Sequence, residues 1–275
     1  MGVKTKISLC EAQELFSDIN ILSIMPTDDG VIDTTYIVET TEEMYVLKRY
    51  ERADKEQISD EVSLLKHLQN CQLNVPSFVT SSNEWNLFSY IKGQTPSLIG
   101  LHEIQALGRF LGRLHRCTCG KKSNVTPFKK KELISVIKEL RRKNLLLAKR
   151  LKPLETFADR EDGIIHGDLF PDNAKFDGKV LGVFDFIEAG NGSFGFDAGV
   201  LAMSWIGKKK ISKAKLQMFL RSYNQHAPQK LTLNRLLCEM KKAALVYCLK
   251  RFTNENERLD HKEMLVRYQT IKNFT

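Results

Sequence analysis

The feature of this sequence that most constrains its fold is a pair of short apolar runs, 174–176 and 180–186, joined by Asp-Gly at 177–178. An Asp-Gly pair between apolar runs is a strong signal for a β-hairpin, because both turn positions need or tolerate a positive φ. Folding this hairpin back brings Asp185, at the end of the second run, next to Asn173, which precedes the first. The sequence therefore predicts that two oxygen-bearing side chains meet at the open end of one hairpin.

Asp168 lies five residues before Asn173, and this D-x-x-x-x-N spacing is that of a kinase catalytic loop. Mg²⁺ takes hard oxygen ligands, often one or two from the protein. Asn173 and Asp185 fit that role, which leaves Asp168 to accept a proton from an attacking hydroxyl group. A surface hairpin with scattered acids is the alternative, since Asp and Asn are common turn formers. Three such residues at these spacings, with His166 two positions before Asp168, favour the catalytic interpretation.

The segment His-Gly-Asp-Leu-Phe-Pro-Asp-Asn at 166–173, followed by Val-Phe-Asp-Phe-Ile-Glu-Ala-Gly at 183–190, resembles the aminoglycoside phosphotransferase, choline kinase and homoserine kinase superfamily. Within it, Asp-Leu-Phe-Pro-Asp-Asn is most similar to the bacterial homoserine kinases of this fold. The resemblance implies an α+β, two-lobed, protein-kinase-like fold. Residues 1–91 would form an N-lobe with an antiparallel sheet and one helix, and residues 92–275 a mostly helical C-lobe. It also implies a kinase that uses ATP and Mg²⁺.

The segment 21–50 has the pattern strand, turn, strand, strand, and its loop at 27–33 would cover the nucleotide phosphates in a kinase. We expect backbone amides near Gly30, and the hydroxyl group of Thr34 or Thr35, to approach those phosphates. The sequence contains no G-x-x-x-x-G-K-[ST], which excludes P-loop chemistry.

Lys48 lies in a strand pattern, and the resemblance makes it the lysine that holds the α- and β-phosphates of ATP. An exposed strand lysine is the alternative, since edge strands often carry lysine. Homoserine kinases of this superfamily often lack a lysine here, whereas choline and aminoglycoside kinases keep it. The helix predicted over 55–69 places Glu61 at the edge of its apolar stripe, from where it can reach Lys48 as in the kinase lysine–glutamate pair. Glu56 is the other candidate.

By the same resemblance, adenine would bind the hinge backbone between Ser89 and Ile91. Asp197 resembles the buried aspartate that supports the catalytic loop in this fold, and we assign His166 to the same structural support. Asp197 lies only twelve positions after Asp185. A protein kinase has a long activation segment with an Ala-Pro-Glu motif at this point, so its absence indicates a small-molecule hydroxyl acceptor.

Glu188 is our candidate for binding a substrate ammonium group, and Arg251 is the candidate for the carboxylate of an amino-acid acceptor. The alternative for Arg251 is an ordinary outer helix position. L-homoserine is the leading acceptor. Choline or ethanolamine comes second because of Lys48, and an aminoglycoside third because those substrates usually need a more acidic pocket. A nucleotide-binding pseudokinase or a basic RNA-associated protein is the alternative of another class.

The net charge of +9 raises nucleic acid as a partner, and many of the cations lie in 129–152. Apolar residues there follow helical spacing, so we expect most of these cations on a solvated helix face. Aromatic residues for a single-strand platform are nearly absent from this segment. No apolar run approaches the length of a membrane span, and the N-terminus shows no apolar signal region. We therefore expect a cytoplasmic monomer or dimer with neither a nucleic-acid nor a membrane partner.

Overall fold

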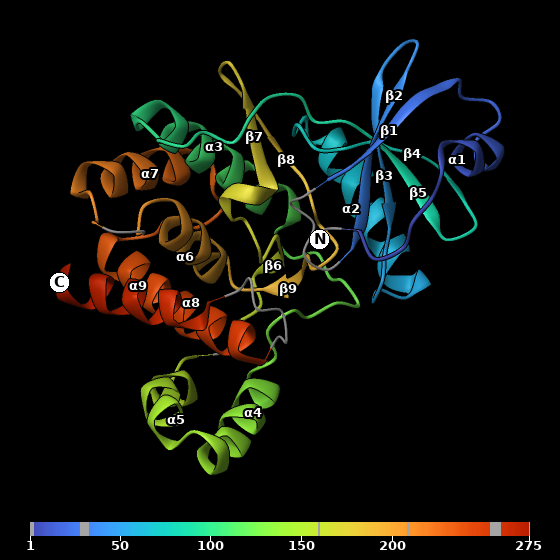
Figure 1. Ribbon diagram of the computed structural model, residues 1–275. Helices are drawn as coiled ribbons and strands as arrows, with labels where there is room; N and C mark the ends of the chain where they lie inside the picture. Colours follow the sequence, from blue (N-terminus) through green and yellow to red (C-terminus); the bar gives the residue numbers. More distant parts are fainter. Residues whose placement is uncertain (1–2, 28–32, 159, 208–209, 254–259, 275) are drawn as a thin grey trace. The chain divides into compact units, whose positions relative to one another are not determined.

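The computed structural model describes residues 3–27, 33–158, 160–207, 210–253 and 260–274 (Figure 1). The chain divides into two compact units. Unit 1 comprises Met1–Gln94 and Gly182–Ile187, and unit 2 comprises Thr95–Leu181 and Glu188–Thr275. Unit 1 thus contains the whole of the predicted N-lobe, 1–91, together with 92–94 and 182–187.

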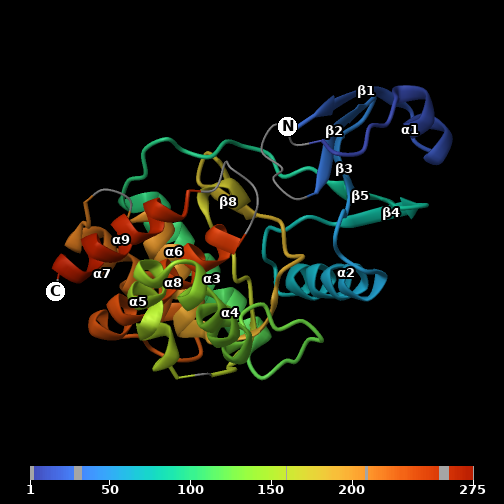
Figure 2. The ribbon, with the colours of Figure 1, turned by 60° about the horizontal axis from the view of Figure 1, so that its bottom comes forward.

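Unit 1 is built on a five-stranded antiparallel sheet with the strand order β1-β2-β3-β5-β4. The strands are β1 (Ile21–Pro26), β2 (Thr34–Thr40), β3 (Met44–Arg49), β4 (Phe78–Ser82) and β5 (Trp85–Ser89). Helix α1 (Leu9–Leu15) contacts β1 and helix α2 (Lys55–Asn70) contacts β4, at the two ends of this order (Figure 2). Alternate residues of β2 are buried, as expected for a sheet with one face on a core. The predicted antiparallel sheet is confirmed, and α1 adds a short helix to the one predicted.

Helix α2 begins at a capping box. The Asp54 side chain accepts a hydrogen bond from the N–H of Gln57, and the Gln57 side chain accepts one from the N–H of Asp54. The buried stripe of the helix contains Glu61, Leu65 and Leu68. A carboxylate therefore lies among the apolar residues of this stripe, and its partners determine what it does.

Unit 2 is mainly helical. Its helices are α3 (Leu101–Thr118), α4 (Lys130–Lys143), α5 (Leu145–Leu151), α6 (Phe194–Trp205), α7 (Lys213–His226), α8 (Leu233–Thr253) and α9 (His261–Phe274), with short 3₁₀ turns η1 (Lys152–Glu155) and η2 (Pro171–Asn173). Helix α3 packs on α7, and α8 packs on both α6 and α9. Two short strands, β6 (Gly163–Ile165) and β9 (Gly190–Gly192), pair antiparallel on either side of the segment that carries Asp168 in the sequence. The predicted α+β class is confirmed.

The predicted hairpin is present. Strands β7 (Ala174–Asp177) and β8 (Val180–Val183) form a two-stranded sheet, and Gly178 in their turn has a φ of 56°. Because Asn173 belongs to unit 2 and Asp185 to unit 1, their predicted approach stays a prediction.

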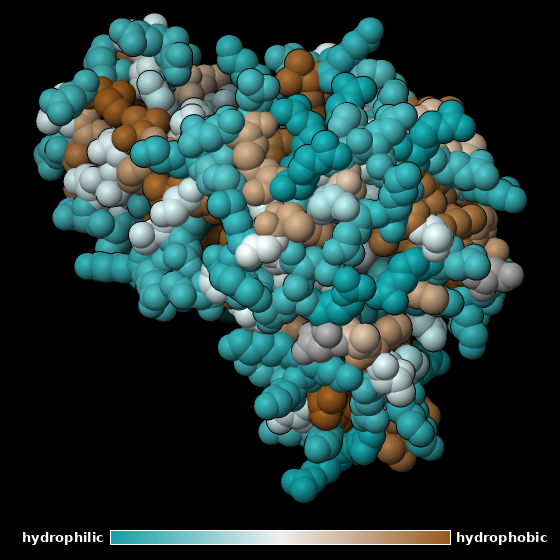
Figure 3. Space-filling view, turned by 180° about the vertical axis from the view of Figure 1, so that it is seen from behind, coloured by the Kyte–Doolittle hydropathy of each residue, from teal (hydrophilic) through white to brown (hydrophobic). Residues whose placement is uncertain are grey.

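The basic segment 129–152 forms two helices, α4 and α5, and not one continuous helix. The Asn144 side chain accepts a hydrogen bond from the N–H of Leu147 at 3.1 Å and so caps a new helix at that point. Ile137 and Leu140 of α4 are buried, which leaves most of the cations on the outer side. The face shown in Figure 3 is mostly hydrophilic, with hydrophobic residues in small groups. In the part of the chain that the structure describes, no helix is long and apolar enough to cross a membrane.

Two glycines of α3 allow its close approach to α7. A Cβ on Gly108 would lie 2.8 Å from the carbonyl oxygen of Phe219, and one on Gly112 would lie 2.7 Å from that of Tyr223. Both obstacles are backbone atoms, which cannot rotate away. We expect Gly112→Ala to lower the free energy of unfolding by about 1–3 kcal/mol, because this overpacking outweighs the better helix propensity of alanine. Urea unfolding measures the change.

Gly195→Ala on α6 is the matched control, since its Cβ would meet side-chain atoms of Glu239 only at 3.4 Å or more. That variant should be neutral or slightly more stable. Equal effects of the two substitutions would contradict the packing argument.

Candidate active site

The segment that carries Asp168 is fixed by a buried carboxylate. Asp197, near the start of α6, is fully buried. Its Oδ2 accepts a hydrogen bond from the N–H of His166 at 3.0 Å, and its Oδ1 accepts one from the N–H of Gly167 at 2.9 Å. Gly167 has a φ of 79°, in the left-handed region that favours glycine. This backbone turn lets two consecutive N–H groups point at one carboxylate, which is the contact expected of Asp197.

Asp197 is in turn part of a chain of buried side chains linked by hydrogen bonds. His115 Nε2 lies 3.0 Å from Asp197 Oδ2, and His115 Nδ1 lies 2.7 Å from the Tyr223 hydroxyl group. The His115 ring stacks on Phe194 with centroids 4.2 Å apart. Burial by itself would raise the pKa of Asp197, but the hydrogen bond and charge of His115, with the other donors, outweigh it and lower this pKa. The carboxylate is therefore ionised, and α3, α6 and α7 together hold it in place.

Asp168 is held by three groups. The single proton of the Tyr247 hydroxyl of α8 is shared between the carbonyl oxygen of Gly167 and Asp168 Oδ1, which lies 2.9 Å away. Asn173 Nδ2 donates to Asp168 Oδ2 at 3.1 Å and to the Asp168 carbonyl oxygen at 2.8 Å. The N–H of Asp168 donates to His166 Nδ1 at 3.2 Å. Burial raises the pKa of Asp168 to about 7, against a lowering by Lys250 and a further raising by Glu188. A carboxyl group with this pKa suits proton transfer near neutral pH.

The amide of Asn173 is oriented by these bonds. Its nitrogen donates both hydrogen bonds to Asp168, so its oxygen is the atom that can bind a cation. Sequence spacing predicted Asn173 as a metal ligand, and this orientation is compatible with that role.

Glu188 and Lys250 form an ion pair in unit 2. The Lys250 ammonium also lies 5.6 Å from the ring centroid of Phe128 and 5.5 Å from that of Tyr247. Glu188 was predicted as a substrate ligand, whereas Lys250 was missed.

Arg251 does not fit its predicted role of carboxylate ligand. Its guanidinium group pairs with Glu263 at 2.8 Å and lies over the Phe170 ring at 5.8 Å. The cation of α8 that acts on Asp168 electrostatically is its neighbour Lys250. Adjacent residues lie about 100° apart around a helix, and periodicity in α8 does not indicate which of the two faces the base.

Unit 1 contains a second cluster of charged groups, around Lys48. Its ammonium group lies 2.8 Å from Asp185 Oδ1, 3.3 Å from Asp33 Oδ2 and 4.5 Å from the ring centroid of Tyr50. Burial would lower the pKa of Lys48, but the charges of Asp185 and its other acidic neighbours outweigh burial and raise it well above its usual range. Lys48 is therefore a permanent cation in this cluster.

The predicted ion pair between Lys48 and Glu61 is absent from the described residues. Glu61 accepts hydrogen bonds from the Tyr50 hydroxyl group and, at 2.9 Å, from the N–H of Phe186. Burial raises the pKa of Glu61, although the charge of Lys48 opposes this. Tyr50, which the sequence analysis missed, thus contacts both residues, and Glu61 acts on the backbone next to Asp185.

Asp185 adopts a φ of 66°, the left-handed conformation that few non-glycine residues take. The bond from Phe186 to Glu61 and the ion pair with Lys48 hold it there. Strained backbone at a charged residue often marks a functional position.

Other residues predicted for the nucleotide site have structural partners. Thr34 is fully buried, its Oγ1 accepts from the N–H groups of Lys4 and Thr5, and it donates to Glu51, so it is unsuited to bind a phosphate. The N–H of Ser89 donates to the carbonyl of Ser77, and its Oγ accepts from the N–H of Ser77.

Three further residues were predicted for the nucleotide site: Thr35, Ile91 and Gly30. Thr35 lies opposite Lys48 in the register of β2 and β3. Ile91 is buried in unit 1. Gly30 lies outside the described residues.

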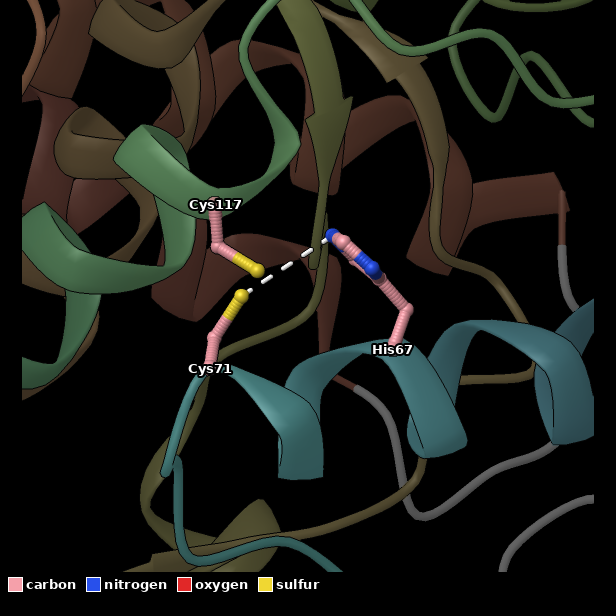
Figure 4. Close-up of side chains that lie close together, drawn as sticks. All are labelled: His67, Cys71 and Cys117. Carbon is pink, nitrogen blue, oxygen red and sulfur yellow. Dashed lines mark hydrogen bonds between the residues drawn. The ribbon is translucent and has the colours of Figure 1, made fainter.

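Figure 4 draws His67 of α2, Cys71 directly after the end of this helix, and Cys117 of α3. Cys71 Sγ lies 3.9 Å from His67 Nε2. Cys117 belongs to unit 2, so unit 1 offers two ligand atoms here, fewer than the three or four protein ligands of a zinc site. We assign no metal centre to this pair.

The lowered pKa of Asp197 gives a prediction about stability. Asp197→Asn cannot accept the same two backbone hydrogen bonds and should lose about 3 kcal/mol of unfolding free energy at pH 7. Because the folded pKa lies below the unfolded one, the contribution is fully present above about pH 4 and is lost as pH falls through the folded value. Urea unfolding at several pH values measures it, with the exposed Asp177→Asn as control. A loss no larger than that of the control would refute the anchoring role.

The raised pKa of Asp168 gives a second prediction. Carbon-13 NMR of the carboxyl group, in protein free of nucleotide and metal, should show a midpoint at about 7. Lys250→Met should move the midpoint up, because a lowering charge is removed, and Glu188→Gln should move it down. A wild-type midpoint at the ordinary aspartate value of about 3.9 would show that the site is more hydrated than its burial indicates.

Comparison with known proteins identifies the family. The model of the phosphotransferase enzyme family matches residues 23–231, most of the chain. A homoserine kinase from Polaromonas naphthalenivorans is 26% identical over 263 residues, which cover 83% of this chain and 81% of that protein.

Two solved structures show the same fold. Amicoumacin kinase hAmiN, in complex with AMP-PNP, Ca²⁺ and Ami, matches with a TM-score of 0.71 at 15% identity, over 98% of this chain and 94% of that one. Choline kinase LicA from Streptococcus pneumoniae matches with a TM-score of 0.64 at 18% identity, over 95% of each chain. The protein-kinase-like fold and the enzyme class predicted from the sequence, an ATP-dependent phosphotransferase with a hydroxyl acceptor, are therefore confirmed. The chain belongs to the phosphotransferase enzyme family.

Proposed function

We propose that this enzyme transfers the γ-phosphoryl group of ATP to the hydroxyl group of L-homoserine. The observation that carries the proposal is the carboxylate of Asp168, which Tyr247 and Asn173 orient and burial brings to a pKa of about 7. The similarity to a homoserine kinase over 83% of the chain supports the choice of acceptor.

Asp168 is the general base in this proposal. Its Oδ1 accepts from Tyr247 and its Oδ2 from Asn173, which fixes the plane of the carboxylate and limits its rotation. It accepts the proton of the acceptor hydroxyl as that oxygen bonds to the γ-phosphorus and the bond to the ADP oxygen breaks. Catalysis in such enzymes is mostly positioning and charge neutralisation, so a rigidly held base is a substantial part of it.

Asn173 and Asp185 are our proposed ligands of Mg²⁺. The donor set fits this ion, because the Asn173 oxygen is the available atom of its amide and Asp185 supplies a carboxylate whose side chain is 40% exposed. When bound, Mg²⁺ neutralises charge on the nucleotide phosphates.

Lys48 is our proposed ligand of the α- and β-phosphates. It is ion-paired with Asp33 and Asp185, so nucleotide binding exchanges carboxylate oxygens for phosphate oxygens around one cation. Backbone near Gly30, the Thr35 hydroxyl group and the hinge backbone at Ile91 complete the proposed nucleotide site.

Choline or ethanolamine is the second candidate acceptor. The neighbouring rings of Phe128 and Tyr247 already lie near an ammonium group, that of Lys250, and aromatic rings also suit a quaternary ammonium ligand. This alternative requires the acceptor to take the place of Lys250.

The test is ATP consumption with L-homoserine, choline, ethanolamine and kanamycin as separate acceptors. L-homoserine should give the highest kcat/KM. Asp168→Asn should lower kcat by about 10²–10⁴-fold with the affinity for ATP almost unchanged, because a base acts on the reaction and not on nucleotide binding. Asp177→Asn, an exposed acid in the hairpin turn, should change neither. Near-normal turnover by Asp168→Asn would overturn the assignment of the base, and a preference for choline would overturn the acceptor.

A further inference from the structure

The ion pair of Glu188 and Lys250 lies beside Asp168 and affects its pKa, but neither residue is the group that accepts the proton in the proposed reaction. Glu188 lies in the turn before β9, and a Cβ on Gly167 would lie 3.7 Å from its carbonyl oxygen. Lys250 lies three residues after Tyr247 on α8, close to the residue whose hydroxyl group binds Asp168. One charge of each sign is therefore held near the catalytic carboxylate.

The pair remains accessible. The Lys250 side chain is 36% exposed and that of Glu188 is 33% exposed, in contrast to the 14% of Arg251. The rings of Phe128 and Tyr247, whose centroids are 5.8 Å apart, lie next to each other and together restrict the Lys250 ammonium on one side. A solute can thus reach both charges, while their positions stay defined.

We propose that this pair is exchangeable and selects a zwitterionic acceptor, whose ammonium group binds Glu188 while its carboxylate binds Lys250. This inference rests on the proposed function, and it adds to that function the class of acceptor and the residues that select it. Glu188 exchanges the ammonium of Lys250 for that of the acceptor, and Lys250 exchanges the carboxylate of Glu188 for that of the acceptor. Both charges of the protein therefore stay paired.

Charge balance explains why a zwitterion fits better than a simple cation. A cation that binds Glu188 separates it from Lys250 and leaves two positive charges near one carboxylate in a half-buried place, which is costly. A simple anion that binds Lys250 separates it from Glu188 and leaves two negative charges near one ammonium group, which is equally costly. Only an acceptor with both charges satisfies both residues.

The other nearby cation cannot replace Lys250 in this role. Arg251 is engaged by Glu263, which also pairs with Arg267 at the same end of α9. Turning Arg251 toward Asp168 would break that network. Lys250 is therefore the residue that can change partner at the lowest cost.

The test compares three acceptors that share a hydroxyl chain and differ in charge: L-homoserine, 3-amino-1-propanol without the carboxylate, and 4-hydroxybutyrate without the ammonium group. For the wild type, kcat/KM should be highest for L-homoserine and at least about tenfold lower for each of the others. Lys250→Met should lower the ratio of kcat/KM for L-homoserine to kcat/KM for 3-amino-1-propanol by about 10–100-fold. Its effect on the pKa of Asp168 is common to all acceptors and cancels in this ratio. Glu188→Gln should lower the ratio of kcat/KM for L-homoserine to kcat/KM for 4-hydroxybutyrate by a similar factor.

Lys242→Met is the matched control, because Lys242 is on the same helix and also lies over aromatic rings, those of Phe157 and Phe196. It should leave all three values within about twofold. If L-homoserine is the best substrate but Lys250→Met lowers all three acceptors equally, the exchange is wrong while the proposed function stands.

If the wild type prefers 3-amino-1-propanol or choline to L-homoserine, both proposals are overturned. If it turns over none of the acceptors, calorimetric binding of L-homoserine decides. Binding that is lost in Lys250→Met and Glu188→Gln, and kept in Lys242→Met, supports the exchange although the proposed reaction has failed. Equal binding by all four proteins, or none by the wild type, overturns the exchange.

Discussion

The catalytic half of this enzyme depends on one buried charge, the carboxylate of Asp197. An ionised group without solvent is tolerated only where donors surround it, and here His115 and the N–H groups of His166 and Gly167 supply them. Satisfying that carboxylate determines the backbone path of the segment before Asp168. The position of Asp168, our proposed base, therefore follows from the electrostatic requirements of Asp197.

Unit 1 uses the same device. The buried carboxylate of Glu61 accepts the N–H of Phe186, the residue after Asp185, as Asp197 accepts the N–H of Gly167, the residue before Asp168. In each unit a buried acid on a helix holds the backbone next to a functional acid on an irregular segment. Such segments have few backbone hydrogen bonds of their own, so a helix-borne acceptor gives them the rigidity that a site requires. The left-handed conformation of Asp185 is stabilised in this way.

Short-range patterns predicted much of this arrangement. The Asp-Gly turn predicted the hairpin, and the kinase-like spacing placed Asn173 against Asp168. The stripe of α2 placed Glu61 correctly on the helix, but its predicted ion pair with Lys48 is replaced by hydrogen bonds with Tyr50 and Phe186. The misses are side-chain contacts between distant parts of the chain. Thr34 is bound by an N-terminal segment about 30 positions away, and Tyr50 contacts both Lys48 and Glu61. The hydrophobic periodicity of the sequence does not indicate either contact. Lys250 was passed over for Arg251 because neighbouring helix positions carry the same charge and differ only in direction.

The division of labour within unit 2 bears on how one fold serves different acceptors. The support of Asp168 comes from α3, α6 and α7, whereas the charges that we assign to acceptor selection come from α8 and the turn before β9. Substitutions at Glu188 and Lys250 therefore leave the anchoring of the base intact, so acceptor preference can change without loss of the phosphotransfer chemistry. Tyr247 is the exception, because its hydroxyl group orients Asp168 while its ring confines Lys250. Changes at Glu188 and Lys250 alter the pKa of Asp168, whereas a change at Tyr247 also removes a hydrogen bond that orients its carboxyl group. This coupling at Tyr247 limits which acceptors the α8 wall can accommodate.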